Sequence, residues 1–424
     1  MKRWVLFGSI VILAILVLSS VRQLWLQAQE TVNGSKYLAN LADAAKTKLH
    51  KKSVGFLVSY QTKNPPENNF DRALRDVAFT YDNAVAAIAF IATGDRLRAK
   101  QLVDSLVYAQ NHDRFYEDGR LRNAYQGGKL DATADPMPLP GWWDRDRAQW
   151  VEDAYQVGSE TGNMAWAILA WLSYYEIYGN RTYLQAATRL GKWIEANCRD
   201  TRGRGGYTAG FRGWEPEPTP LRYKSTEHNI DLYVAFSRLY QHTRRDMWRE
   251  GALAAKQFVM SMWDQQAGKF WTGTTPDGVT INRTVIPLDI HSWALLAFSE
   301  KDLPNTQQIL DYVETHHQTE DGFDFNQDGD GIWYEGTAHM ALAYRSLGKK
   351  RPTKRLLAFL QASQHESGAL FASNREGGIT TGFFLDDGSP WLYFRRLHVG
   401  ATAWYMLAES GVNPFWVKKN PSFL

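Results

Sequence analysis

Five acidic side chains open five strongly apolar stretches of the chain. They are Asp82, Glu160, Glu227, Asp289 and Glu335. Paired carboxyl groups can divide acid and base work, because one protonates a leaving oxygen while the other activates a water molecule. Acidic residues are also favoured at helix N-termini, where the dipole and capping stabilise them by roughly 0.3–1 kcal/mol each. The five residues therefore predict a reaction site only if the fold brings them to one place.

Glu227 is the strongest candidate for the proton donor. It stands in the densely polar segment 223–231, at the start of an apolar run. A carboxyl group pressed against apolar walls has a raised pKa, which a general acid needs. We expect Asp289 or Asp82 to act as the base, with Glu160 as a third candidate.

Four of the ten histidines also lie at or near the start of apolar stretches. They are His228, His291, His339 and His398. An imidazole pKa near neutrality suits general acid–base work. The alternative is that these rings cap helices or form hydrogen bonds without chemistry of their own. We expect His228, His291 and His398 to contact substrate.

The chain is rich in aromatic residues, with 17 Trp, 20 Tyr and 20 Phe. Trp and Tyr offer flat apolar faces with a polar edge, which suit sugar rings as well as protein cores. Seven Trp fall in otherwise polar segments between the apolar stretches: Trp142, Trp143, Trp150, Trp214, Trp271, Trp333 and Trp391. Long loops also need small cores of their own. We expect substrate to contact Trp142, Trp143, Trp214, Tyr223, Trp271 and Trp333.

One segment carries a calcium-loop signature. Residues 324–335 match the pattern D-x-[DN]-x-[DN]-G-x5-E in full. The predicted ligands are Asp324, Asn326, Asp328, Asp330 and Glu335. Gly331 replaces the usual apolar residue, and residues 318–323 do not predict a helix, so a paired EF-hand is not expected. The alternative is an acidic turn without an ion; if calcium binds, Glu335 is a ligand rather than an acid catalyst.

A repeated pattern of elements positions these side chains. Six stretches of small and large apolar residues, each preceded by a polar cluster, alternate with amphipathic helices. Several of the six are apolar nearly all round, which indicates helices buried on every side. The expected buried helices span residues 84–92, 164–172, 230–239, 292–298, 338–344 and 401–407. The expected amphipathic helices span residues 37–50, 96–110, 181–195, 247–263, 305–317 and 352–361. Short strands are expected near residues 269–275 and 380–385.

The connections between these helices are asymmetric. Tight turns lead from a buried helix to the next amphipathic helix, as at residues 92–95, 178–180 and 347–349. Long loops lead onward to the next buried helix, and loops of this length are usually functional. If the hairpins pack side by side, all long loops and all buried-helix N-termini fall at one end.

Twelve helices in this order predict an all-α fold, an (α/α)6 barrel or six-hairpin toroid. Each hairpin cannot bury its apolar surface alone, so neighbouring hairpins must cover it. An open helical solenoid is the competing architecture. The spacing between repeats varies from 48 residues (His291 to His339) to 81 residues (Asp82 to Asn163), whereas solenoids keep a tighter period.

The N-terminus predicts a membrane segment. Lys2 and Arg3 precede an apolar run from Trp4 to Val21, which is near the lower length limit for a bilayer span. Because no clean cleavage site follows, we favour an uncleaved anchor over a signal peptide. Residues 1–30 are then the cytoplasmic tip and anchor, and residues 31–424 form the barrel in the periplasm or outside the cell.

Overall composition excludes several classes of protein. The net charge of +3 gives no reason to expect nucleic acid as a partner, and a single cysteine, Cys198, excludes a disulfide framework. The hydrophobic share of 44% and the charged share of 22% are typical of a globular chain.

The hairpin count, the polar residues that open the buried helices and the Trp-rich loops resemble the six-hairpin glycosidase superfamily over residues 36–410. Members of that superfamily are mostly inverting glycoside hydrolases acting on polysaccharides. The resemblance implies a hydrolase of an envelope or extracellular polysaccharide that works with two carboxylates and no organic cofactor. No single glycosidase family is identified, so no catalytic residue is carried over from one.

The same barrel also hosts other activities, so the fold does not settle function. A sugar epimerase on it uses paired histidines. A polysaccharide lyase uses a Tyr or His base with arginines that neutralise a uronate, and Tyr393, Arg395 and Arg396 keep that alternative open. A third alternative is a non-catalytic polysaccharide-binding component of an export system.

Overall fold

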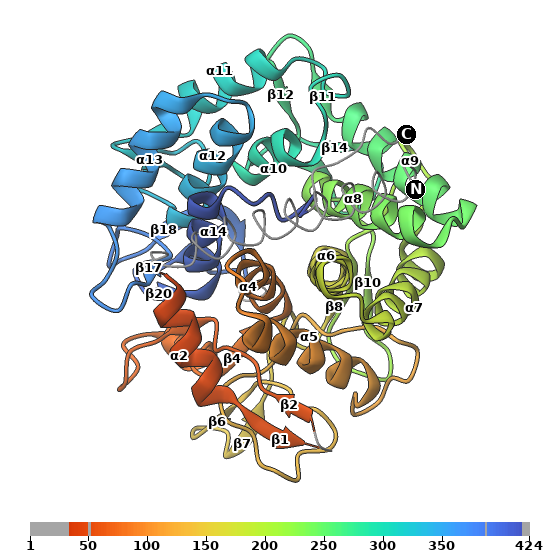
Figure 1. The fold of residues 1–424 in the computed structure, drawn as a ribbon, viewed down its shortest axis with the longest axis vertical. Coiled ribbons are helices and arrows are strands. Elements are labelled where there is room, and N and C mark those ends of the chain that lie inside the picture. Colours follow the sequence, from red (N-terminus) through yellow and green to blue (C-terminus); the bar gives the residue numbers. More distant parts are fainter. Residues whose placement is uncertain (1–33, 50–51, 386–387, 418–424) are drawn as a thin grey trace, which may run out of the picture.

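The computed structural model describes residues 34–49, 52–385 and 388–417, and in it two concentric rings of helices close on themselves (Figure 1). The inner ring consists of α4 (Thr80–Ala92), α6 (Thr161–Tyr178), α8 (Thr226–Thr243), α10 (Asp289–Ala297), α12 (Tyr334–Ser346) and α14 (Val399–Ser410). Each inner helix contacts the next along the chain, and α14 contacts α4. The ring is therefore closed, and an open solenoid is excluded.

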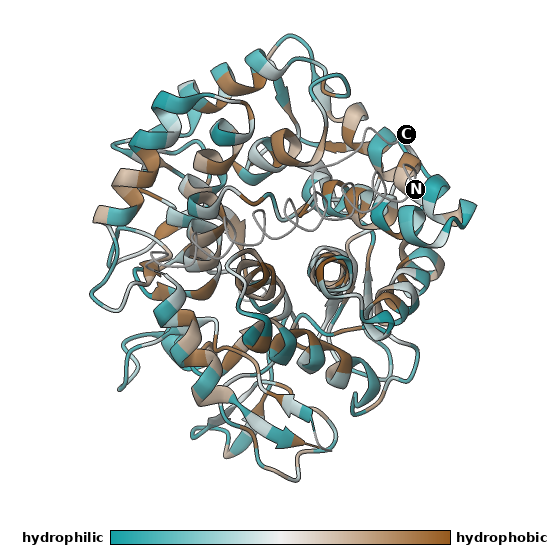
Figure 2. Cartoon of the chain, viewed as in Figure 1, coloured by the Kyte–Doolittle hydropathy of each residue, from teal (hydrophilic) through white to brown (hydrophobic). Residues whose placement is uncertain are grey.

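The outer ring covers the inner one. It consists of α2 (Ser35–Ala45), α5 (Arg96–Asn111), α7 (Arg181–Cys198), α9 (Asp246–Ser261), α11 (Thr306–His316) and α13 (Lys350–Ala362). Each outer helix packs on an inner partner, with α2 packing on α14. Hydrophilic residues gather on the outward side of the outer helices, whereas α4 and α6 are hydrophobic nearly all round (Figure 2). This is the pattern expected of helices buried on every side.

Local signals in the sequence set where the outer helices begin. The side chains of Asp95, Asn180 and Asn305 each accept a hydrogen bond from a backbone N–H in the first turn of the helix that follows. Gly179 ends α6 in the left-handed conformation, with φ at 79°, which glycine adopts without strain. These caps permit the short connections from inner to outer helices.

The long connections from each outer helix to the next inner helix carry short antiparallel strands. The strands are β1 (Thr47–Leu49), β2 (Lys52–Val54), β3 (Tyr60–Gln61), β4 (Val77–Phe79), β5 (Ala124–Gln126), β6 (Trp142–Asp144), β7 (Gln149–Val151), β8 (Ser159–Glu160), β9 (Gly210–Arg212), β10 (Thr219–Leu221), β11 (Trp263–Asp264), β12 (Lys269–Phe270), β13 (Gly273–Thr274), β14 (Ile281–Asn282), β15 (Gln318–Thr319), β16 (Gly322–Phe323), β17 (Leu370–Phe371), β18 (Ile379–Phe384), β19 (Pro390–Tyr393) and β20 (Leu397–His398). They form sheets of two or three strands, and a short helix, α3 (Asn69–Ala73), precedes β4. The strands expected near residues 269–275 and 380–385 are confirmed.

The C-terminal segment packs into the ring at the end opposite the long connections (Figure 1). Phe415 is fully buried against Trp166 and Trp293, with ring centroids 5.1 and 5.9 Å apart. The guanidinium of Arg238 donates to the carbonyl of Phe415 at 3.3 Å, and the Asn413 amide donates to the carbonyl of Leu296 at 2.8 Å. This end of the inner ring is closed by side chains.

Two sequence expectations need correction at helix ends. The helix expected over residues 37–50 ends at Ala45, and Thr47–Leu49 turns back as a strand paired with β2. Gly55 then passes so close to Ala45 that a Cβ would lie 2.1 Å from its carbonyl oxygen, so the backbone occupies the path of a longer helix. The helix expected over residues 247–263 ends at Ser261, because Trp263 pairs with Phe270 in a strand.

The apolar run from Trp4 to Val21 lies outside the described residues. Within residues 34–49, 52–385 and 388–417, the helices are too short or too polar to cross a membrane.

Candidate active site

The five predicted carboxylates lie at the same end of the inner ring. Asp82, Glu227, Asp289 and Glu335 belong to the first turns of α4, α8, α10 and α12, and Glu160 directly precedes α6. Glu227 is half-buried and the other four are buried. Glu227 interacts electrostatically with Asp289, Glu160 and Glu335. Ring closure therefore brings together side chains that are far apart in the sequence.

A tyrosine hydroxyl and two nearby imidazoles favour the ionised form of Glu335. The Tyr81 hydroxyl donates to Glu335 Oε1 at 2.5 Å across 254 residues of sequence, and the Trp404 indole donates to that hydroxyl at 2.7 Å. His339 Nε2 lies 3.6 Å from Oε1, and His398 Nδ1 lies 3.5 Å from Oε2. Burial opposes ionisation, but the bonds and charges of these neighbours hold the pKa of Glu335 below its usual range.

His398 lies between two carboxylates. Its Nε2 is 3.4 Å from Asp82 Oδ1, and its ring stacks on Tyr60 with centroids 4.3 Å apart. Burial lowers the pKa of His398, but the charges of Asp82 and Glu335 outweigh burial and raise it above the usual value. A Cβ on Gly400 would lie 2.7 Å from Asp82 Oδ1 and 2.8 Å from Glu335 Oε2. Glycine at position 400 thus leaves room for both carboxylates.

The pKa values of a second set of acids are raised instead of lowered. Desolvation, followed by the charges of Asp289 and Asp231, raises the pKa of Glu227 well above its usual value. Burial, partly offset by the backbone N–H of Ile290, raises the pKa of Asp289 to about 7. Burial, followed by the charge of Asp289, also raises the pKa of Asp231 well above its usual value. These three groups favour the protonated state.

Glu160 belongs to neither set. Its Oε1 lies 3.5 Å from an Arg212 nitrogen, and the Tyr223 hydroxyl lies 3.5 Å from Oε2. Arg212 also lies over the ring of Tyr155 at 5.6 Å. Tyr223 therefore contacts a carboxylate of the site, and its contact with substrate stays a prediction.

The other three histidines predicted from the sequence, His228, His291 and His339, are buried inside the ring as neutral groups. Burial lowers the pKa of His228 to about 4 and that of His291 well below its usual value. His228 packs where Gly162 has no side chain, and His291 Nε2 accepts a hydrogen bond from the Phe270 backbone at 3.1 Å. His339 Nδ1 accepts from the Trp293 indole at 3.2 Å, which leaves Nε2 to carry the proton toward Glu335.

The predicted Trp residues divide into two groups. Trp333 is buried and stacks on Tyr393 with centroids 5.8 Å apart, so it helps to form the wall of the site. Trp142 and Trp143 lie on the β6–β7 hairpin, where Trp143 is 57% exposed, and Trp214 is 48% exposed. Lys269 and Arg283 lie over the ring of Trp271, at 4.1 and 4.9 Å. Substrate contact by these Trp residues stays a prediction.

The predicted calcium loop brings three of its carboxylates together, and Glu335 is not among them. Carboxylate oxygens of Asp324, Asp328 and Asp330 lie within 4.8 Å of one another. The Asn326 amide donates to the carbonyl of Thr380 at 3.0 Å. Because α12 already begins at Tyr334, the helix carries the Glu335 side chain to the inside of the ring, where Tyr81 binds it. Calcium binding by the rest of the loop stays a prediction.

The two arginines on which the lyase alternative depends, Arg395 and Arg396, form ion pairs with acidic side chains outside the ring of carboxylates. Arg396 is buried and forms two bonds to Asp71, at 2.8 and 2.9 Å. Arg395 pairs with Glu376 at 2.9 Å. Neither guanidinium contacts the carboxylates of the ring among the described residues.

Sequence reasoning missed three residues of the site. Tyr81 immediately precedes Asp82, and Asp231 lies one helical turn after Glu227, so spacing from a known acid could have found both. Tyr155, whose hydroxyl accepts from Asn163 at 3.3 Å and whose ring contacts Trp391, comes from a long loop and carries no comparable signal.

No protein-family model and no curated protein matches this chain. Solved structures do match it. A glycosidase in complex with glucose is 12% identical, with a TM-score of 0.58, over 91% of this chain and 98% of that one. Cellobiose 2-epimerase from Bacillus thermoamylovorans is 13% identical, with a TM-score of 0.57, over 84% and 92%. A family 76 glycoside hydrolase from a bovine Bacteroides thetaiotaomicron strain is 14% identical, with a TM-score of 0.56, over 90% and 78%. This chain therefore shares its (α/α)6 barrel fold with glycosidases and a sugar epimerase.

Proposed function

We propose that the chain is a glycoside hydrolase that cleaves a polysaccharide or oligosaccharide. The observation that carries the proposal is the gathering of five carboxyl groups at one end of the ring, where burial raises the pKa values of Glu227 and Asp289, and the Tyr81 hydroxyl and two imidazoles hold that of Glu335 low. Environments that push the pKa values of neighbouring acids apart identify acid and base roles. Glycosidases among the structures that share the fold support the same activity.

Glu227 gives its proton to the leaving oxygen. It is the half-buried member of the protonated set, and Asp289 and Asp231 keep its pKa raised. Water activation falls to Asp82 or Glu335, the two carboxylates on either side of His398. Asp82, expected as a base from the sequence, keeps Oδ2 without a hydrogen-bond partner among the described residues. Asp289, the other expected base, is less suited because its pKa of about 7 leaves it only about half ionised at neutral pH.

The charge of the site favours neutral sugars. Several carboxyl groups share one small volume, and an anionic uronate placed among them would be repelled. The cations that a lyase would use, Arg395 and Arg396, are held by Glu376 and Asp71. The N-terminal apolar run supports, as a proposal only, a membrane-anchored enzyme that meets its substrate outside the cytoplasm.

Replacing Glu227 by Gln tests the proposal on a panel of neutral and uronate-containing polysaccharides. Wild type releases reducing ends, and Glu227→Gln lowers turnover by about a hundred- to ten-thousand-fold while sugar binding by calorimetry is retained. Glu217→Gln, an exposed acid in the loop before α8, serves as the matched control and keeps full turnover. Unchanged turnover in Glu227→Gln rejects the assigned acid.

A sugar epimerase is the second candidate. It is favoured by the position of His398 between Asp82 and Glu335, where an imidazole can take and return a proton. In heavy water an epimerase places deuterium on a ring carbon without releasing new reducing ends. That outcome with a disaccharide would favour the epimerase over the hydrolase.

A further inference from the structure

The end of the ring opposite the carboxylates carries a field of positive charge. It is formed by the five connections that lead from an inner helix to its outer partner. Each connection places at least one exposed cation at or near the start of the outer helix. These cations are Arg96, Arg181, Arg244, Arg245, Lys301, Lys350 and Arg351.

Three of these cations stand at the first positions of outer helices. Arg96, Arg181 and Lys350 are the first residues of α5, α7 and α13. The N-terminus of a helix is the positive end of its dipole, so acids there stabilise the helix and cations do not. The inner helices end at the same face, where their dipoles are negative, so the dipoles of the two rings oppose each other. The positive potential of this end therefore comes from the exposed side-chain cations.

Acidic residues at this end do not cancel the charge. Asp95, Asp246 and Asp302 form ion pairs with Arg98, Arg249 and Lys256, which lie farther along the outer helices or on their sides. Arg181, Arg245, Lys350 and Arg351 form no ion pair with a described residue. Glu250 and Glu300 are exposed nearby, but they are fewer than the cations.

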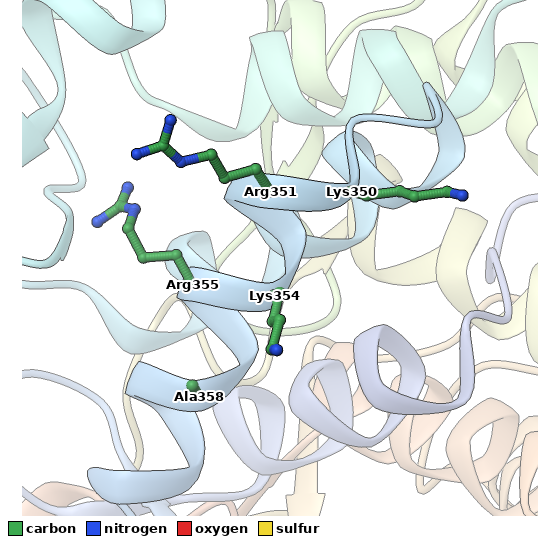
Figure 3. Close-up of a pocket in the computed structure, with 5 residues that line it drawn as sticks. All are labelled: Lys350, Arg351, Lys354, Arg355 and Ala358. Carbon is green, nitrogen blue, oxygen red and sulfur yellow. The ribbon is translucent and has the colours of Figure 1, made fainter.

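Helix α13 extends the charged surface onto the side of the ring. Lys350, Arg351, Lys354 and Arg355 line a shallow depression along this helix, with their side chains extending away from it (Figure 3). A large apolar side chain also projects at the charged end, since Leu97 is 79% exposed beside Arg96.

We propose that this charged end docks onto a lipid bilayer through anionic phospholipid headgroups. The cations are spread over five separate connections instead of converging into one groove, which suits an extended planar surface more than a peptide. Exposed apolar residues such as Leu97 favour the boundary between headgroups and acyl chains. Docking leaves the carboxylate end directed away from the membrane. The proposal goes beyond the enzymatic activity and does not depend on it.

The test places an environment-sensitive fluorophore on Leu97→Cys in the full chain. The native Cys198 is buried and burial raises its thiol pKa to about 12, so labelling is selective for position 97. The labelled protein is mixed with vesicles of phosphatidylcholine alone or with about one third phosphatidylglycerol. We expect a blue shift of emission with anionic vesicles only, reversed by about 1 M salt, where the Debye length falls to about 3 Å.

Charge reversal supplies the matched variants. Arg181→Glu, Arg245→Glu, Lys350→Glu and Arg351→Glu together abolish the anionic-lipid shift, because each neutralised cation weakens docking about fivefold. Folding is preserved, since acids are favoured at helix N-termini. Arg145→Glu with Arg147→Glu, at the tip of the β6–β7 hairpin on the other end, leaves the shift intact. Equal emission in both vesicle types, or a shift with soluble polyanions but none with vesicles, overturns the proposal.

Discussion

At the residue scale, the chemistry depends on neighbouring side chains that shift the pKa values of similar carboxyl groups in opposite directions. Glu335 receives the Tyr81 hydroxyl and lies near two imidazoles, whereas Glu227 faces other acids. The sequence predicts which residue types gather, because acids recur at the starts of apolar stretches. It does not predict their ionisation, since Tyr81 reaches Glu335 from a helix 254 residues away.

The pH dependence of kcat/KM follows from these two sets. The acid set must keep its proton, so activity falls as the pH rises through its raised pKa values, with an alkaline limb beginning near that of Asp289, about 7. The limb belongs to the coupled acids Glu227 and Asp289 rather than to either alone. On the acid side, activity persists below the ordinary glutamate pKa of about 4.3, because the pKa of Glu335 is lowered. Steady-state kinetics across pH check both limbs. A profile that is flat above neutrality contradicts the assignment of the acid.

At the element scale, helix starts position the site. The periodicity of apolar residues predicts the twelve helices well, because each must bury a continuous surface. Their ends are less predictable: the helix at residues 37–50 stops where the backbone of Gly55 blocks it. The position of Glu335 also depends on where a helix begins. The calcium-loop pattern considers only the order of residues along the chain. In the structure α12 begins at Tyr334 and directs the Glu335 side chain to the inside of the ring.

Gly400 tests the close packing of α14 against the acids. In Gly400→Ala the new Cβ would lie under 3 Å from both Asp82 and Glu335, so at least one carboxylate must move. We expect turnover to fall at least about tenfold, since a misplacement of about 1 Å can cost a hundredfold. The same substitution at Gly377, where a Cβ meets nothing within 4 Å, is the control and leaves turnover and Tm unchanged. Equal turnover in both variants contradicts the packing argument.

At the scale of the whole molecule, ring closure makes one site out of segments spread along the chain. The contact of α14 with α4 completes the inner ring, and the C-terminal segment fills the end away from the acids. The alternation of helix types and the unequal connections predict this closure. The C-terminal closure is not predicted, because residues 411–417 carry no periodic signal.

Replacing Phe415 by Ala tests how much the C-terminal segment contributes to the free energy of unfolding. Its ring is buried against Trp166 and Trp293, so Phe415→Ala leaves a cavity in the centre of the ring. Removal of a buried Phe side chain typically lowers the free energy of unfolding by about 3–5 kcal/mol. Chemical denaturation of the variant and of wild type measures the loss. A change within about 0.5 kcal/mol, as for surface substitutions, would show that the segment does not close the ring in solution.

Hydrolysis of a neutral polysaccharide in water enriched in heavy oxygen tests the central claim most directly. If the two sets of carboxyl groups cleave a glycosidic bond with water, mass spectrometry finds one solvent oxygen at each new reducing end. The incorporation depends on Glu227, whose role is proton donation. Products that carry no solvent oxygen, or rearranged sugars without chain cleavage, would contradict the account.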